Sequence, residues 1–220
     1  MRRPGRTSWV ATAALATAAL GGCFGDTTTE FPPGLEPLED DTAPAQQGGS
    51  YTETLTMVDG ELTNYTWVHG RGYILADPGT VWAASKDVDV MASACSTDTY
   101  SAEVGVEPEY EYGFRISYEV DQVITIAWDE LWRYGTIEGT PSAPTLAMIR
   151  YQKVFGSELI QLIEGSVQLH ATDDPDVTEI ETIEHLAAAG GGASDIRASM
   201  QYRFDSLAAV AHGQPQPPCP

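Results

Sequence analysis

Hydrophobic and polar residues alternate with a period of two along much of the chain from residue 51 onward. The clearest case is the segment 110–120, in which one phase is apolar or aromatic and the other is polar or charged. Such alternation is typical of a long strand with one face in the core and one in water. The phase expected to face inward consists of Tyr110, Tyr112, Phe114, Ile116, Tyr118 and Val120.

Two further segments alternate in the same way, and Asp121-Gln122 predicts a turn between the first two strands. The segment 123–134 would place Ile124, Ile126, Trp128, Trp132 and Tyr134 on one side. The segment 195–204 would turn Ile196, Ala198, Met200, Tyr202 and Phe204 inward and Arg197, Ser199, Gln201 and Arg203 outward. Asp59-Gly60 separates two alternating runs, 51–58 and 61–68, and predicts a hairpin with a type I′ turn.

Shorter apolar runs predict more strands, at 72–75, 81–84, 87–92, 146–155 and 166–171. Residues 158–164 fit a buried strand or a helical turn equally. Residues 177–189 fit a helix that begins after Asp174-Pro175 or a strand, and their β-branched residues favour the strand. Eight or more strands with Gly-rich turns, and at most one short helix, predict an all-β fold: an antiparallel sandwich or barrel.

The N-terminus has a different pattern. Arg2, Arg3 and Arg6 precede an uncharged run of twelve residues, Trp9–Leu20. A helix needs roughly 20 residues to cross about 30 Å of hydrocarbon, so this run is too short for an anchor and is typical of a secretory signal. It ends in Leu20-Gly21-Gly22-Cys23, which resembles the lipobox of bacterial lipoproteins.

The resemblance implies that the signal peptide 1–22 is removed and that the thiol of Cys23 carries a diacylglycerol. Acyl chains contribute about 0.8 kcal/mol per buried CH₂, so two or three chains attach a protein stably to a membrane. The expected partner of the N-terminus is therefore a membrane of the cell envelope. In the family an Asp after the cysteine favours retention in the inner membrane, and Phe24 stands there, which implies the outer membrane.

Residues 23–50 are expected to form a disordered tether. Beyond Cys23 they contain six acidic residues and four prolines, but no Lys or Arg. Such a segment cannot bury enough apolar surface to offset its ordering entropy. The β domain would then span 51–214, with a Pro-rich tail at 215–220.

The C-terminal part contains three short motifs: Gly165-Ser166-Val167-Gln168-Leu169, Phe204-Asp205-Ser206-Leu207 and His212-Gly213. In these motifs it is similar to uncharacterised surface lipoproteins of high-GC bacteria, such as myxobacteria. The similarity implies no activity.

The length and net charge of the chain limit the classes of function that it can have. The chain has 220 residues, enough for one ordinary domain, with 32 acidic and 11 basic residues and a net charge of −21. Removal of the signal peptide would take three arginines away and lower the net charge to −24. Because there are too few basic residues to neutralise phosphates, nucleic acid is excluded as a partner.

The sequence has few motifs that carry chemistry. It lacks a Gly-rich phosphate loop, a Gly-x-Ser-x-Gly elbow and a zinc-ligand spacing, so we expect no cofactor. The four histidines are scattered and are expected at turns or rims. The cluster of Asp173, Asp174 and Asp176 could supply oxygens to Ca²⁺, or it could be a solvated turn.

Glu130 is the most interesting acid because it shares a predicted strand face with Trp128, Trp132 and Tyr134. A carboxyl group among aromatic rings can bind a ligand such as a sugar, or have a raised pKa. The alternative is that this face is core and that Glu130 reaches solvent near the strand end.

Cys95 and Cys219 are expected to form a disulfide. Acylation of Cys23 leaves only these two thiols, and an exported protein meets an oxidising compartment.

Taken together, these features predict a lipid-anchored, non-enzymatic β domain with a structural or binding role. The alternatives are a barrel that binds a small lipid or sugar, and a carboxylate-dependent hydrolase.

Overall fold

A computed structural model describes residues 25–39, 44, 50–92, 94–121 and 123–220. Its strands are β1 (Asp26–Thr28), β2 (Leu55–Glu61), β3 (Thr66–Ile74), β4 (Thr99–Val104), β5 (Tyr112–Asp121), β6 (Thr125–Thr140), β7 (Ala143–Ser157), β8 (Ile160–Ala171) and β9 (Thr178–Ala188). Its helices are α1 (Pro78–Ser85), α2 (Val88–Met91) and α3 (Ala193–Ala211).

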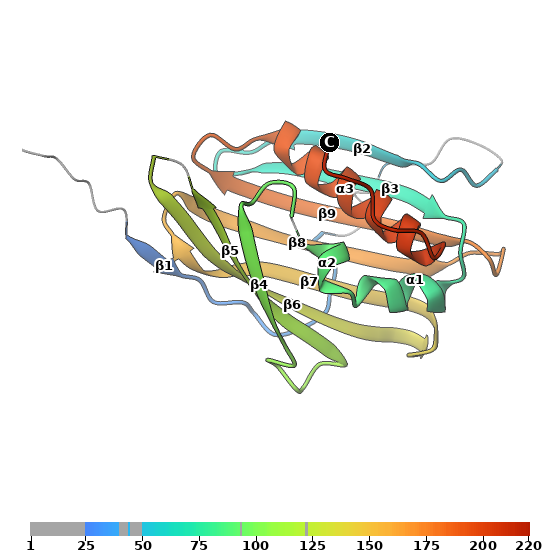
Figure 1. Cartoon of the computed structure of the whole chain (residues 1–220). Coiled ribbons are helices and arrows are strands. Elements are labelled where there is room, and N and C mark those ends of the chain that lie inside the picture. Colours follow the sequence, from blue (N-terminus) through green and yellow to red (C-terminus); the bar gives the residue numbers. More distant parts are fainter. Residues whose placement is uncertain (1–24, 40–43, 45–49, 93, 122) are drawn as a thin grey trace, which may run out of the picture.

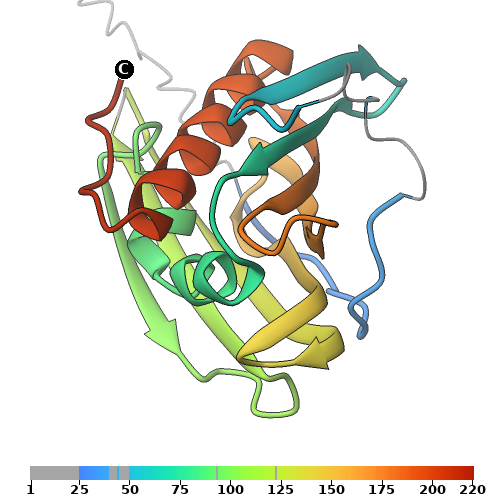
Figure 2. The same ribbon diagram turned by 90° about the vertical axis from the view of Figure 1, so that its right-hand side faces the viewer.

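The strands form one antiparallel sheet that curves around the helices (Figure 1). Its order is β2-β3-β9-β8-β7-β6-β5-β4, and the short β1 pairs with the end of β7. Helix α3 crosses the concave face, with α1 and α2 beside it (Figure 2). The all-β, antiparallel class expected from the sequence is thus confirmed.

The core lies between the concave face and the helices and is rich in aromatic side chains. Fully buried rings come from α1, β5, β6 and β7: Trp82, Phe114, Trp132, Tyr134 and Tyr151. Strand β5 shows the predicted phase, because Phe114 and Ile116 are fully buried while Ser117 and Glu119 are exposed. Strand β6 follows the predicted phase from Ile126 to Tyr134. Residues 177–189 adopt the favoured alternative, strand β9.

The strand predicted at 195–204 is wrong, because these residues lie in α3. The helix buries Ile196, Met200 and Phe204, which are four residues apart, and Leu207. A spacing of four fits a helix face, but it also keeps every second residue in phase, so the pattern resembled a strand. Ala198, predicted to face inward, is exposed.

The strands predicted at 81–84 and 87–92 are also wrong, since they lie in α1 and α2. Asp77 caps α1 by accepting a hydrogen bond from the Thr80 backbone at 3.0 Å, and Pro78 occupies the first turn. Asp87 caps α2 through the Asp89 backbone at 3.0 Å. With α3 as well, the expectation of at most one short helix is wrong.

The hairpin around Asp59-Gly60 exists, but its turn is displaced. Asp59 pairs with Val68 and Gly60 with Trp67 inside the β2–β3 ladder. The turn lies at residues 62–65, where the Leu62 N–H donates to the Tyr65 carbonyl at 2.9 Å. A side chain at Gly60 would collide with the ring of Trp67, so this glycine allows close packing rather than a turn.

Residues 25–39, expected in the disordered tether, instead lie against the convex face of the sheet. Phe31 is only 9% exposed, and the Arg133 guanidinium lies 3.7 Å from the centre of its ring. The Leu38 N–H donates to Ser166 Oγ at 3.1 Å. The domain therefore begins well before residue 51. Cys23, the signal peptide and the rest of the tether, 40–43 and 45–49, lie outside the described residues, as does Gln122.

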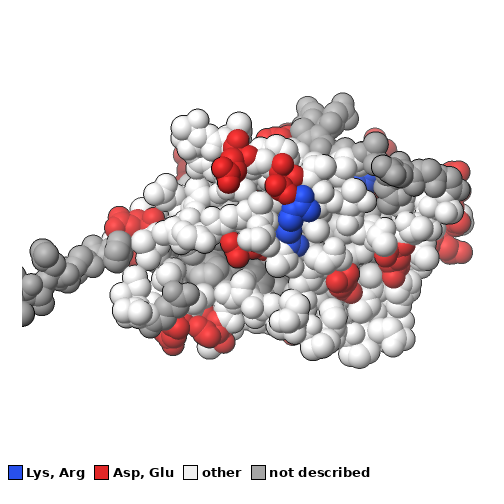
Figure 3. Space-filling view, turned by 90° about the horizontal axis from the view of Figure 1, so that it is seen from above, with Lys and Arg blue, Asp and Glu red and all other residues white. Residues whose placement is uncertain are grey.

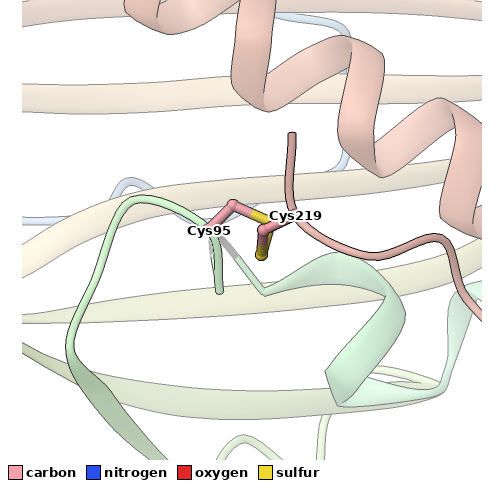
Figure 4. The surroundings of a disulfide bond; sticks show 2 residues. All are labelled: Cys95 and Cys219. Atoms are coloured by element: carbon pink, nitrogen blue, oxygen red, sulfur yellow. A yellow bond between two sulfur atoms is a disulfide. The ribbon is translucent and has the colours of Figure 1, made fainter.

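The expected disulfide is present. Cys95, in the loop between α2 and β4, is joined to Cys219 in the C-terminal tail, with a Cα–Cα distance of 5.3 Å (Figure 4). The tail is thereby fixed beside α3.

On the face seen in Figure 3, the described acidic side chains outnumber the basic ones. None of the described helices combines the length and apolar character needed to cross a bilayer.

Candidate functional site

Four polar side chains are buried in the aromatic core between the sheet and α3. Glu130 comes from β6, Tyr151 from β7, Glu184 from β9 and Arg203 from α3, and none of these residues, taken whole, is more than 6% exposed. Burial of charged groups costs free energy unless they are paired and hydrogen-bonded. We call these four residues the concave cluster.

Arg203 is at the centre of the concave cluster. Its Nη1 donates to Tyr151 Oη at 3.0 Å, and its Nη2 donates to Glu184 Oε2 at 3.2 Å and to Ser199 Oγ at 3.2 Å. The hydroxyl of Tyr151 in turn donates to Glu184 Oε2 at 2.6 Å. The guanidinium also lies 5.3 Å from the ring centre of Trp132. Burial opposes the charged form of Arg203, but Tyr151 and Glu184 together outweigh it, so the pKa of Arg203 is raised.

Glu130 accepts hydrogen bonds from two indoles on its own strand. Trp128 Nε1 donates to Oε1 at 2.9 Å, and Trp132 Nε1 donates to Oε2 at 3.1 Å. Residues 128, 130 and 132 share a face because side chains alternate along a strand. Burial raises the pKa of Glu130 to about 7, since it outweighs the indole hydrogen bonds; the charge of Glu184 also raises it and that of Arg203 lowers it.

The sequence correctly grouped Trp128, Glu130 and Trp132, but Tyr134 has a different role. Its hydroxyl donates to the Ser85 carbonyl at 3.0 Å, which ties β6 to the end of α1. The alternative was right that this face is core, because Trp128, Trp132 and Tyr134 all belong to the core. It was wrong that Glu130 reaches solvent, because this residue is only 3% exposed.

Little space remains inside the core, but a pocket adjoins the concave cluster. The cavity between α3 and the sheet has a volume of about 20 Å³, which suits roughly one water molecule. A larger pocket, of about 230 Å³, lies between α3 and the loop that carries the disulfide. Ser199 lines this pocket and accepts the hydrogen bond from Arg203. The pocket is lined by Cys95, Ser96, Asp195, Ala198, Ser199, Tyr202 and Pro220.

A second group of ionisable residues lies on the convex face, and we call it the convex cluster. It consists of Glu39, His69 and His185, whose ligand atoms all lie within 4.8 Å of one another. Among the residues that the structure describes, this is the one group of three or more that could hold a metal ion. The expectation that histidines stand at turns or rims is wrong for His69 and His185, which are buried on β3 and β9.

The structure does not bring Asp173, Asp174 and Asp176 together as such a group. All three are exposed in the loop between β8 and β9. The carboxylate of Asp174 accepts the backbone N–H of Asp176 at 3.0 Å, and that of Asp173 accepts a hydrogen bond from the Tyr51 hydroxyl. These contacts are those of a solvated turn.

No protein-family model and no curated protein sequence matches this chain. Several solved structures share its arrangement of strands around a helix. The Zhui aromatase/cyclase from Streptomyces sp. R1128 is 13% identical, with a TM-score of 0.43, and the match covers 72% of this chain and 94% of that one. The human StarD13 lipid transfer and protein localization domain is 8% identical, with a TM-score of 0.48 and coverage of 72% and 86%. A likeness this distant is no guide to a ligand or an activity.

Sequence reasoning missed Tyr151, Glu184 and Arg203. The predicted strand at 195–204 placed Arg203 in water, whereas the helix turns it inward. The missed signal is the helical spacing of Ile196, Met200, Phe204 and Leu207, which puts position 203 on the same buried face. Glu39 was missed because its segment has the composition of a disordered tether.

Proposed function

We propose that this chain is a lipid-anchored protein of the cell envelope whose β domain binds a small, mostly apolar ligand beside α3 and does not catalyse a reaction. The observation that carries the binding role is the concave cluster, which Ser199 connects to the 230 Å³ pocket through its hydrogen bond with Arg203.

The energetics of the concave cluster favour a role beyond packing. A buried ion pair such as Arg203–Glu184 can often be replaced by apolar residues of similar volume with no loss of stability. A core that keeps the pair retains a polar group of fixed orientation next to the pocket. Small-ligand sites commonly combine mostly apolar walls with a few polar groups of this kind.

The lining of the pocket indicates the class of ligand. Cys95, Ala198, Pro220 and the ring of Tyr202 supply apolar surface, and the side chains of Ser96, Asp195 and Ser199 supply polar contacts. This composition favours an acyl chain or another lipid fragment over a sugar, which would need many hydrogen bonds.

Binding is favoured over carboxylate-dependent hydrolysis. A glycosidase needs two carboxyl groups that face the bond to be cleaved. Here both oxygens of Glu130 accept indole hydrogen bonds, and Glu184 is engaged by Tyr151 and Arg203. Because the residues Glu130 and Glu184 are only 3% and 6% exposed, their carboxyl groups have no open side for a substrate.

The binding role is tested by isothermal titration calorimetry, in which the protein is titrated with each member of a panel of single-chain fatty acids and oligosaccharides. Ala198→Phe would fill the pocket, and Gln201→Phe, a part-exposed neighbour that does not line it, is the matched control. We expect a fatty acid to bind the wild type and the Gln201 variant equally and the Ala198 variant at least 10-fold more weakly. Equal binding by both variants, or binding of no panel member, would contradict the proposal.

The anchor rests on the lipobox and is tested separately. Cys23→Ser should leave the precursor uncleaved or release the protein into the soluble fraction, whereas Cys219→Ser should fractionate with the membrane like the wild type. Density-gradient separation of inner and outer membranes tests the outer-membrane location. Unchanged mass and membrane association of the Cys23 variant would rule the anchor out.

A further inference from the structure

Residues that are far apart in the sequence meet in the convex cluster. Strands β3 and β9 pair with His69 opposite Ile183 and Trp67 opposite His185, so the two histidines are diagonal neighbours on one face of the sheet. They are 5% and 3% exposed. Glu39, from the N-terminal segment, covers both of them.

The carboxylate of Glu39 lies between the two imidazoles. Its Oε2 is 3.2 Å from His69 Nε2, and its Oε1 is 3.2 Å from His185 Nε2. In a tetrahedral zinc site with bonds of about 2.0–2.2 Å, neighbouring ligand atoms are roughly 3.3–3.6 Å apart. Each nitrogen therefore lies at nearly this spacing from one carboxylate oxygen, and one ligand atom from each of the three residues lies within 4.8 Å of the others.

Glu164 supplies an independent indication of a metal site. It stands opposite His185 in the β8–β9 ladder, and its Oε1 is 3.1 Å from Nδ1 of His185. A carboxylate that accepts Nδ1–H fixes the tautomer in which Nε2 has a free lone pair, which is how metal-binding histidines are commonly oriented.

The other ring nitrogen of His185 faces Glu39. Its Nε2 is buried and makes no hydrogen bond among the described residues, and it lies 3.2 Å from Glu39 Oε1. Because Nδ1 faces Glu164, Nε2 is the nitrogen of His185 that points toward the proposed ion. One ion at this place would have both the imidazole and the carboxylate as ligands.

Aromatic rings hold both imidazoles in place. The ring of Tyr65 stacks on His185 with centroids 4.4 Å apart, and the ring of Trp67 lies 4.5 Å from that of His69. Such packing restricts the rotamers of the ligands, which favours a preformed site.

We propose that Glu39, His69 and His185 bind one divalent transition-metal ion of the Zn²⁺ type. Two imidazoles and a carboxylate suit Zn²⁺, whereas Ca²⁺ and Mg²⁺ prefer oxygen ligands. Three protein ligands leave a fourth position for water. Since Glu39 belongs to the N-terminal segment, the ion also fastens this segment to the strands β3 and β9.

The test uses the full-length, untagged protein in detergent, stripped of metal with a chelator and titrated with Zn²⁺ alone. We expect one ion per chain. His69→Ala and His185→Ala should weaken binding at least 100-fold, and Glu164→Gln about 10- to 100-fold. His212→Ala is the matched control, because this exposed histidine pairs with Glu53 at 2.9 Å outside the cluster, and it should bind as the wild type does.

Two further measurements keep the outcome decisive. Co²⁺ in place of Zn²⁺ should give the visible absorption of a tetrahedral site, and Zn²⁺ should slow proteolysis within residues 25–39. If a histidine variant loses the far-ultraviolet circular dichroism signal of the folded protein, Glu39→Gln is used instead. Glu39 lies in the N-terminal segment outside the sheet, and its side chain is 31% exposed, so this variant is expected to fold. Absence of stoichiometric binding, or equal affinity of the cluster variants and the wild type, would overturn the proposal.

Discussion

The two faces of the sheet are covered in different ways. The concave face packs against the 19-residue helix α3, which contributes seven buried side chains, whereas the convex face carries the segment 25–39, in which Phe31 is the buried hydrophobic residue. The ion pairs differ accordingly. In Arg203–Glu184 the two side chains are 7% and 8% exposed, but in His69–Glu39 they are 6% and 31% exposed.

This difference separates two roles of similar chemical groups. A pair that is desolvated on both sides interacts in a low dielectric, so the loss of one partner leaves a buried charge. A pair with one wet partner is screened by water. We expect concave contacts to determine whether the domain folds and convex contacts to determine whether the N-terminal segment stays attached.

The largest effect is expected at Arg203. Arg203→Ala leaves Glu184 buried without its cation, which should lower the free energy of unfolding by about 3–5 kcal/mol. Arg197, on the exposed side of the same helix, pairs with Asp59, and the two side chains are 36% and 34% exposed. Arg197→Ala should cost no more than about 1 kcal/mol. Urea unfolding measures both variants, and similar losses would contradict the contrast between desolvated and screened pairs.

Strand β5 allows the two faces to be compared at neighbouring residues. Ile116 is fully buried on the concave side. Ile116→Ala should lower the free energy of unfolding by about 2–4 kcal/mol, because it leaves a cavity in the core. Ser117→Ala, at an exposed position on the other side, should be nearly silent. Both are measured by urea unfolding under the same conditions; equal effects would show that the strand does not separate core from solvent.

Glu130 should give the concave face a pH dependence. The pKa of Glu130 is about 7 in the folded protein and near 4.5 in the unfolded chain, so folding favours the neutral form of this carboxyl group. The resulting stabilisation is complete below pH 4.5 and is lost as the pH rises through 7, at most about 3 kcal/mol in total. Glu130→Gln should remove this decline in unfolding free energy between pH 4.5 and 8.

Glu111 is the control of opposite sign. Burial opposes its ionisation, but hydrogen bonds from Lys86 and Thr136 lower its pKa to about 2. Its contribution is therefore present above pH 4.5 and is lost as the pH falls toward 2. Glu111→Gln should flatten the stability curve on the acidic side only. If both variants change the same side of the curve, the assignment of Glu130 is wrong.

Apart from the control variants, the smallest effect is expected at Phe31. Phe31→Ala removes the ring beneath the Arg133 guanidinium and should cost about 1–2 kcal/mol, because the segment can detach without opening the core. Hydrogen exchange should speed up at the Thr29 amide, which donates to the Val154 carbonyl at 2.9 Å, but not at the amides of β5. Global unfolding of the variant would show that the convex cover is part of the core.

The sequence predicted those parts in which a single element determines the pattern. The alternation in β5 and β6 identified two strands, their inward faces and the Trp128–Glu130–Trp132 group. Helix α3 was missed because apolar residues four apart satisfy both periods. The pairing of Arg203 with Glu184, and of Glu39 with His69 and His185, depends on how separate elements pack. No spacing along one strand or helix could reveal these contacts.

The disulfide divides the chain into a covalently closed ring and a linear part. Cys95 and Cys219 are separated by 124 positions, so the strands β4 to β9 and helix α3 all belong to one closed ring, while β1, β2, β3, α1 and α2 form a linear arm. A single cut in a loop of the ring, such as that between β8 and β9, produces two fragments that stay covalently joined through the disulfide. A cut before Cys95, such as that between β2 and β3, produces two polypeptides joined only by sheet pairing and packing. Nicked forms of this protein would therefore differ in whether a reductant is needed to separate them.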